Sequence, residues 1–210
     1  MGDPSRVALS RDRIAATALA MTDEVGLDGL SMRKLGSALG VEAMSLYHYV
    51  KNKADLCDAM IDLVFHEVTL PDDIPDDDWE TAFRQGLTTF NDVLVRHPAA
   101  LNLVIDRSAR SGRALKTLMW AYGRLAAVGL DPEDAHKAFQ FAASFVIGHR
   151  VLTLGSSAGT SAQIDSGPDD VSLEQVAEFI AQRDAVSTQE EFKSGLDAVI
   201  AGLRAAYNLP

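Results

Sequence analysis

A thirteen-residue stretch near the N-terminus gathers side chains capable of hydrogen bonding, aromatic contact and ionic contact. It runs from Val41 to Lys53 and reads VEAMSLYHYVKNK. Tyr47, His48 and Tyr49 are consecutive, and a Lys-Asn-Lys sequence follows them. Three uses fit this composition: a catalytic pocket, a surface that contacts the bases and phosphates of nucleic acid, or an aromatic-rich helix packed on a neighbour.

The residues around this stretch predict two short helices separated by a glycine, which is the pattern of a helix-turn-helix motif. Ser31 is the expected N-cap of the first helix, which ends at Leu39 before Gly40, and the second helix runs from about residue 42 to 49. Aliphatic residues account for the packing between the two helices: Leu35, Leu39, Val41 and Leu46. The polar and aromatic residues are left for other faces, where the second helix of such a motif reads base edges in the major groove.

The charge of the chain is unevenly distributed. The net charge of the 210 residues is −11, which for a whole chain argues against nucleic-acid binding. Residues 1–53, however, carry a net charge of +1, so the remainder carries −12. This distribution favours a small DNA-reading module attached to an acidic second domain.

Several other classes of protein find no support in the residue types. Cys57 is the only cysteine, so no internal disulfide or cysteine-rich zinc site is expected, and a small buried hydrophobic residue is its simplest interpretation. The five histidines lack the spacing of metal ligands, and we expect no metal and no cofactor. No apolar run approaches the length of a membrane span and the N-terminus lacks a signal-peptide core, so the expected location is the cytoplasm.

Helical periodicity continues through the rest of the chain and predicts an all-α fold. Further helices are expected at about residues 11–25, 53–68, 98–107, 112–128, 132–154, 173–184 and 189–206, and another helix carries Trp79, Phe83, Leu87 and Phe90. The expected N-caps of the helices that begin near residues 11, 53 and 132 are Ser10, Asn52 and Asp131, and capping boxes at Ser172/Gln175 and Thr188/Glu191 open the last two helices. Residues 155–170 are small and polar and are expected to form a loop. A Pro- and Asp-rich segment, LPDDIPDDD, interrupts this pattern at residues 70–78. We therefore predict an N-terminal DNA-binding domain at residues 1–68 and a C-terminal helical domain at residues 77–210.

One long segment closely resembles the DNA-binding part of the tetracycline-repressor (TetR) family, over about residues 10–65. It contains EVGLDGLSMRKLGSALGVEAMSLYHYVKNKADLCDAMI, in which GL..LSMRKLG, LGV, SLYHYVKNK and the following DL match the family. The C-terminal part resembles the family more weakly, through HPAALNLVI, GLDPEDAHKAFQFAASFVIGH and FKSGLDAVIAGL. The resemblance implies a homodimer that binds double-stranded operator DNA, and a C-terminal ligand-binding and dimerisation domain whose small-molecule effector changes the spacing of the DNA-reading parts.

The resemblance also implies roles for individual residues. Arg33 matches a base-reading position, and four others match groove-facing positions: Ala43, Met44, Ser45 and His48. The DNA backbone is the expected partner of Ser31, Tyr47, Tyr49 and Lys53. The residue types at positions 43 and 48, Ala43 and His48, differ from those in the tetracycline repressors themselves. This protein is therefore not expected to bind the operator sequence of the tetracycline repressors.

The effector expected from the sequence is small and mostly apolar. The tetracycline repressors hold their drug through a magnesium ion and a histidine, but the segment NLVIDRSAR has no histidine, which argues against a tetracycline–magnesium ligand. A mostly apolar pocket is expected from a set of nine residues: Trp79, Phe83, Phe90, Asn102, Met119, Trp120, Phe139, Phe145 and His149. For each aromatic residue the alternative is that it simply fills the core.

Three functions from different classes remain open at this stage. A ligand-responsive repressor accounts for both domains. An all-helical enzyme would need a nucleophile, a base or a metal cluster in the C-terminal part, and no such residues have the required spacing, so no catalytic residue is expected. A protein-binding adaptor would leave the basic residues around the second short helix unexplained.

The apolar faces of the helices at 132–154 and 189–206 favour a two-fold interface.

Overall fold

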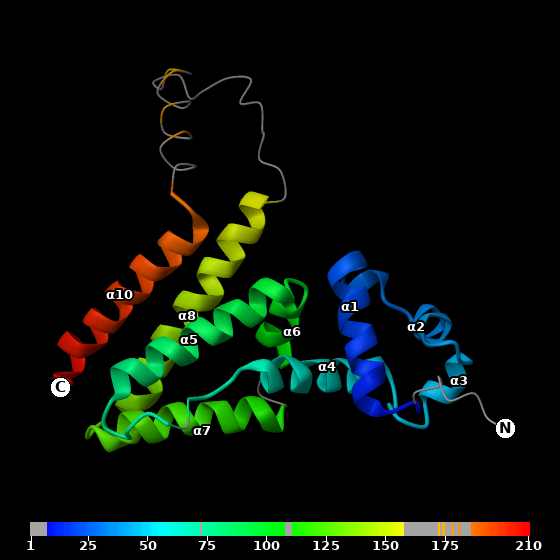
Figure 1. Ribbon diagram of the computed structural model, residues 1–210, viewed down its shortest axis with the longest axis horizontal. Helices are drawn as coiled ribbons and strands as arrows, with labels where there is room; N and C mark the ends of the chain where they lie inside the picture. Colours follow the sequence, from blue (N-terminus) through cyan, green and yellow to red (C-terminus); the bar gives the residue numbers. More distant parts are fainter. Residues whose placement is uncertain are drawn as a thin grey trace. The chain divides into compact units, whose positions relative to one another are not determined.

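The computed structural model describes residues 8–71, 73–107, 111–157, 172, 174, 178, 181 and 186–210. Every regular element among these residues is a helix, which confirms the all-α prediction (Figure 1). The chain divides into two compact units, residues 1–127 and 128–210. This division, between residues 127 and 128, lies C-terminal to the predicted domain boundary at residues 68–77. The predicted assignment of domains stays a prediction.

The first unit begins with four helices: α1 (Arg11–Gly29), α2 (Met32–Leu39), α3 (Ala43–Leu46) and α4 (Lys53–Glu67). The predicted N-caps are confirmed, because the side chains of Ser10, Ser31 and Asn52 each accept a hydrogen bond from the backbone amide three residues later. Gly26 has a φ of +73° and interrupts the helical path of α1 where the sequence predicts its end.

Helix α3 is shorter than predicted, so the expected helix over residues 42–49 is wrong in its second half. After Leu46 the chain forms a turn, in which the amides of Tyr47 and Tyr49 bond to carbonyls three residues back. No side chain caps the start of α3. Helices α2 and α3 approach closely at Gly36, where an added Cβ would lie 2.8 Å from the carbonyl oxygen of Val41.

The core of this region consists of aliphatic side chains from all four helices. Helix α1 packs on α4, and α2 packs on α1 and α3. The fully buried residues include one or more from each helix: Ile14, Ala18, Leu35, Leu46, Leu56 and Met60. Cys57 is also buried, as predicted. Of the aliphatic residues that were expected to join α2 and α3, Leu35 and Leu46 are buried, whereas Leu39 and Val41 are half-buried.

Three more helices complete the first unit: α5 (Trp79–Arg96), α6 (Ala100–Arg107) and α7 (Gly112–Ala127). Helix α4 contacts α6 and α7, and α5 contacts α7. The buried guanidinium of Arg124 in α7 donates to the carbonyl oxygens of Pro71, Ile74 and Pro75, at 3.3, 2.6 and 2.6 Å. Arg124 thus fixes the segment between α4 and α5, which has no helix of its own.

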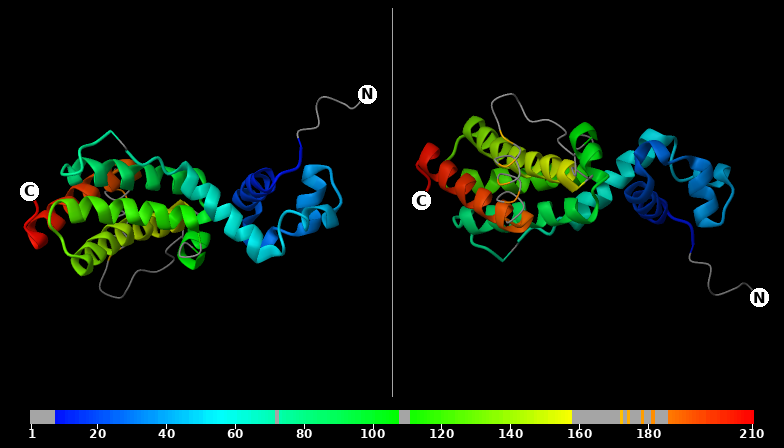
Figure 2. Two further views of the ribbon diagram at one scale, coloured as in Figure 1. Left: turned by 90° about the horizontal axis from the view of Figure 1, so that it is seen from below. Right: turned by 90° about the horizontal axis from the view of Figure 1, so that it is seen from above.

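The second unit contains α8 (Pro132–Ser157) and α10 (Thr188–Tyr207), which pack against each other (Figure 2). The carboxylate of Asp131 accepts the first free amides of α8, as its predicted capping role requires. The capping box of α10 uses Ser187 and Glu190, one residue earlier than predicted. The predicted loop at 155–170 and helix at 173–184, with its box at Ser172/Gln175, lie largely outside the described residues. Among the described helices, none is long and apolar enough to cross a membrane.

Candidate functional site

The side chains predicted to contact DNA are displayed around α3. Met44 is 73% exposed, Tyr47 42% and Tyr49 41%, which is unusual for large apolar and aromatic residues in so short a segment. His48 and Arg33 are also exposed, whereas Ala43 and Ser45 are half-buried. Helix α3 and the turn that follows it therefore present an accessible surface whose aromatic rings do not belong to the core.

Two of the predicted backbone contacts also have roles within the protein. The hydroxyl of Ser31 caps α2 by accepting the amide of Lys34 at 3.3 Å. The ammonium group of Lys53 donates to the carbonyl oxygens of Leu27 and Leu30, at 3.0 and 3.1 Å. Lys53 thus ties the start of α4 to the end of α1, where free carbonyl groups favour a positive charge.

An ion pair between α1 and α4 holds the turn that follows α3. The guanidinium of Arg11 donates to both carboxylate oxygens of Asp55, at 2.6 and 3.1 Å, and to the carbonyl oxygen of Tyr49 at 3.0 Å. The amide of Lys51 donates to Asp55 at 2.7 Å. The Arg11 hydrogen bond, followed by that from Lys51, lowers the pKa of Asp55 to about 2. Sequence reasoning missed this pair, because 44 residues separate its members.

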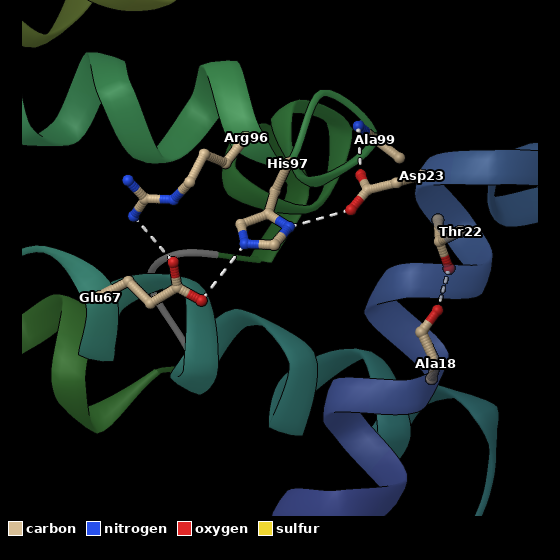
Figure 3. Close-up of polar contacts among 7 residues, drawn as sticks. All are labelled: Ala18, Thr22, Asp23, Glu67, Arg96, His97 and Ala99. Atoms are coloured by element: carbon tan, nitrogen blue, oxygen red, sulfur yellow. Dashed lines mark hydrogen bonds and ion pairs between the residues drawn. The ribbon is translucent and has the colours of Figure 1, made fainter. Parts of the chain in front are cut away.

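A second polar cluster joins α1, the end of α4 and the α5–α6 turn (Figure 3). His97 contacts Asp23 through Nδ1 at 2.9 Å and Glu67 through Nε2 at 3.2 Å. Asp23 also accepts the amide of Ala99 at 3.2 Å, and Arg96 pairs with Glu67 at 2.8 Å. Burial opposes ionisation of Glu67, but Arg96 and His97 outweigh it and lower the pKa of this carboxyl. We call these five residues the His97 cluster.

The six predicted pocket residues of the first unit occupy different environments. Trp79 and Phe83 are almost fully buried and pack edge to face, with ring centroids 6.1 Å apart, so they fill the core. Phe90 stacks on Phe65 of α4 at 5.9 Å. Asn102 and Met119 are exposed. Trp120 is half-buried, and its ring covers Gly86, where an added Cβ would lie 3.2 Å from it.

Two buried polar atoms in the same unit were missed by sequence reasoning. Among the described residues, Oδ1 of Asn91 and Nε1 of Trp120 have no hydrogen-bond partner, although Asn91 is only 7% exposed. Buried polar groups in proteins are nearly always paired, so each such atom suits a ligand or water. Nothing in the sequence distinguishes Asn91 from other polar residues of an amphipathic helix.

The three predicted pocket residues of the second unit lie on α8. Phe145 stacks on His149 and on Phe192 of α10, with ring centroids 6.1 and 5.6 Å apart. Phe139 is half-buried. Burial, followed by the neighbouring charge of Arg150, lowers the pKa of His149, so its imidazole is neutral at pH 7. Phe145 and His149 thus belong to the packing between α8 and α10.

The second unit also exposes apolar surface. Phe141 is 56% exposed and Leu152 is 73% exposed on α8. A groove is lined by Phe141 of α8 and by four residues of α10: Gly202, Leu203, Ala206 and Tyr207. Within the described residues, no group of three histidine, cysteine or acidic side chains is placed to hold a metal ion.

Sequence comparison identifies the family to which both parts of this arrangement belong. Residues 14–60 match the profile described as "Bacterial regulatory proteins, tetR family", and residues 70–207 match "Tetracyclin repressor-like, C-terminal domain". The chain belongs to the tetracycline-repressor family. The first match covers α2, α3 and most of α1 and α4, and thereby the exposed surface of α3.

Individual members of the family are moderately similar to this chain. An HTH-type transcriptional regulator of Saccharopolyspora erythraea is 34% identical over 140 residues, which are 67% of this chain and 59% of that protein. Tetracycline repressor protein class D of Escherichia coli is 26% identical over 92% of this chain and 88% of its own length. ActR of Streptomyces coelicolor, solved in complex with actinorhodin, superimposes with a TM-score of 0.75 at 26% identity, covering 95% of this chain and 99% of ActR. The chain spans 59% and 52% of the first two curated relatives that it matches.

Proposed function

We propose that the protein is a ligand-responsive transcriptional repressor that binds operator DNA as a homodimer in the cytoplasm and is released by a small, mostly apolar effector. One observation carries this proposal: α3 and the turn that follows it expose Met44, Tyr47 and Tyr49 beside a packed helix-turn-helix core. Membership of a family of bacterial regulatory proteins and the name of the S. erythraea relative support it.

The exposed residues of α2 and α3 divide into two proposed roles. Arg33, Met44 and His48 are accessible enough to reach base edges in the major groove, and Ala43 and Ser45 suit short contacts there. Tyr47 and Tyr49 lie at and after the end of α3 and suit contacts to the sugar–phosphate backbone. Lys53 contributes less directly, because its ammonium group already donates to two carbonyl groups in the DNA-free protein.

A second copy of the chain is the proposed cover for the exposed apolar face of the second unit. Phe141 and Leu152 lie on one side of α8, and the groove against α10 continues that apolar surface. Surface of this kind is typical of an isologous two-fold interface. Sedimentation of the protein as a monomer at micromolar concentration would contradict a stable dimer.

The effector is proposed to occupy the C-terminal part of the chain, where some buried polar atoms have no partner among the described residues. Asn91 and Trp120 offer an acceptor and a donor, and the related ActR was crystallised with a small molecule, actinorhodin. The His97 cluster supplies a contiguous connection from the α5–α6 turn to α1 and α4. Through it, a displacement of α6 by ligand would reach the helices that support α3.

Selection of binding sites from random duplex DNA tests the function directly. The proposal expects one two-fold symmetric sequence, with half-sites about one helical turn apart or somewhat more. Recovery of no sequence would favour an enzyme or a protein-binding adaptor, the two alternatives left open by the sequence.

Variants of the selected complex test the division of roles. Tyr47→Ala is expected to weaken binding to every sequence, because it removes a contact to the DNA backbone. Arg33→Ala is expected to reduce the discrimination between bases at one position of the operator by about 1–3 kcal/mol. Gel shifts on a panel of mutated operators measure both effects. Equal losses on every operator for both variants would contradict the division.

A further inference from the structure

Among the described residues, Arg150 of α8 is a buried arginine without a partner for its charge. Arg150 is 8% exposed, and its Nε is completely enclosed without a hydrogen-bond partner. Within the described part of the chain, its side chain forms no hydrogen bond or ion pair. Burial lowers the pKa of Arg150, but a guanidinium remains protonated at any physiological pH. Burial of an unpaired charge is strongly unfavourable, and none of the described residues supplies an anion to this guanidinium.

Arg150 lies on the side of α8 opposite the exposed residues Phe141 and Leu152. A second copy of the chain that covers those two residues would therefore not supply the anion for Arg150. Arg150 ends a stripe of small buried residues spaced by three or four positions: Ala135, Ala138, Ala142 and Val146. At about 100° per residue, Arg150 lies about 180° from Phe141 and about 160° from Leu152 around the helix axis. A second copy of the chain that covers Phe141 and Leu152 would therefore approach the face of α8 opposite Arg150.

We propose that Arg150 binds a carboxylate of the effector, so that the ligand is an organic acid with an apolar body; this inference rests on the proposed function. The edge of a guanidinium formed by Nε and one terminal nitrogen is complementary to a planar carboxylate, and in Arg150 this Nε is unpaired. The small apolar residues that precede Arg150 along the stripe favour a singly charged group over a phosphate, because the desolvation penalty grows with charge.

Matched pairs of neutral and acidic probes test this assignment on the full chain. The probes are 2-naphthoate with 2-naphthamide, and decanoate with decanamide, titrated by calorimetry and by tryptophan fluorescence against the wild type, Arg150→Met and Arg204→Met. Arg204→Met is the matched control, because it removes an equal charge from an exposed arginine of α10. Wild type and Arg204→Met are expected to bind at least one acid tenfold or more tightly than its amide. Arg150→Met is expected to lose that preference.

A second readout follows from the unpaired charge and needs no ligand. Met is similar in length to Arg and uncharged, so Arg150→Met is expected to raise the melting temperature of the ligand-free protein. The preferred acid is expected to raise the melting temperature only of the proteins that retain Arg150. The inference is overturned if no acid is preferred over its amide by the wild type, or if the preference persists in Arg150→Met. A wild type that selects no DNA sequence but prefers acids would refute the proposed repressor and leave the carboxylate site intact.

Discussion

Replacement of Asp55 by asparagine separates the electrostatic contribution of one ion pair from the rest of the DNA-binding region. Asp55 accepts three hydrogen bonds, two from Arg11 and one from the amide of Lys51, and its pKa is about 2 instead of 3.8. At about 1.4 kcal/mol per pKa unit, this difference corresponds to about 2.5 kcal/mol. The Arg11 side chain is 40% exposed, so solvent screening reduces the contribution that we expect to about 1.5 kcal/mol.

The sign of the pH dependence follows from the direction of the pKa. The carboxyl of Asp55 is more acidic in the folded protein than in the unfolded chain, so its contribution to the free energy of unfolding is complete above about pH 5 and declines as the pH falls through 3.8 toward 2. The stability difference between wild type and Asp55→Asn should therefore be constant near neutral pH and shrink on acidification.

Urea unfolding measured between about pH 7 and pH 3 tests this expectation. Glu24→Gln is the control, because Glu24 is exposed on α1 and forms no hydrogen bond or ion pair among the described residues. A control that loses as much stability as Asp55→Asn, or a difference that does not change with pH, would refute the reasoning. Because Arg11 also holds the carbonyl of Tyr49, Asp55→Asn should in addition weaken binding to the selected operator several-fold.

Three further measurements address packing, the His97 cluster and DNA affinity. In Gly195→Ala the new Cβ would lie 2.5 Å from the ring of Phe145, so we expect a loss of about 1–3 kcal/mol in urea unfolding, whereas Gly123→Ala, with no atom within 4 Å, should gain about 0.5–1 kcal/mol. Asp23→Asn removes a charged acceptor of two hydrogen bonds in the His97 cluster, and a loss of about 1–2 kcal/mol is expected, against none for Glu24→Gln. Operator affinity should fall steeply as salt is raised from about 50 to 200 mM, and a gel-shift series without that dependence would argue against phosphate contacts.

The sequence alone was sufficient wherever local chemistry decides the structure. Ser31, Asn52 and Gly40 mark helix ends through caps and a left-handed backbone, which depend on neighbouring residues only. The apolar spacing of Leu35 and Leu46 predicted which side of the motif is buried, and the run of residues around α3 was specific enough to identify the family. The length of α3 and the capping box of α10 were wrong by one to a few residues, because alternative caps and turns of nearly equal energy lie side by side there.

Contacts between distant residues were decided by the tertiary structure alone. Arg11 and Asp55 are 44 positions apart, and Asp23 and His97 are 74 apart, so no periodicity or motif links them. The charge of Arg150 looks unremarkable in a sequence in which 23% of the residues are charged, and only its burial, with no partner among the described residues, makes it a candidate ligand-binding group. Helix ends, apolar faces and the exposed residues of α3 are properties of short segments and can be predicted from sequence. Pairing of charges depends on which segments meet in space, and for that reason only the folded structure shows it.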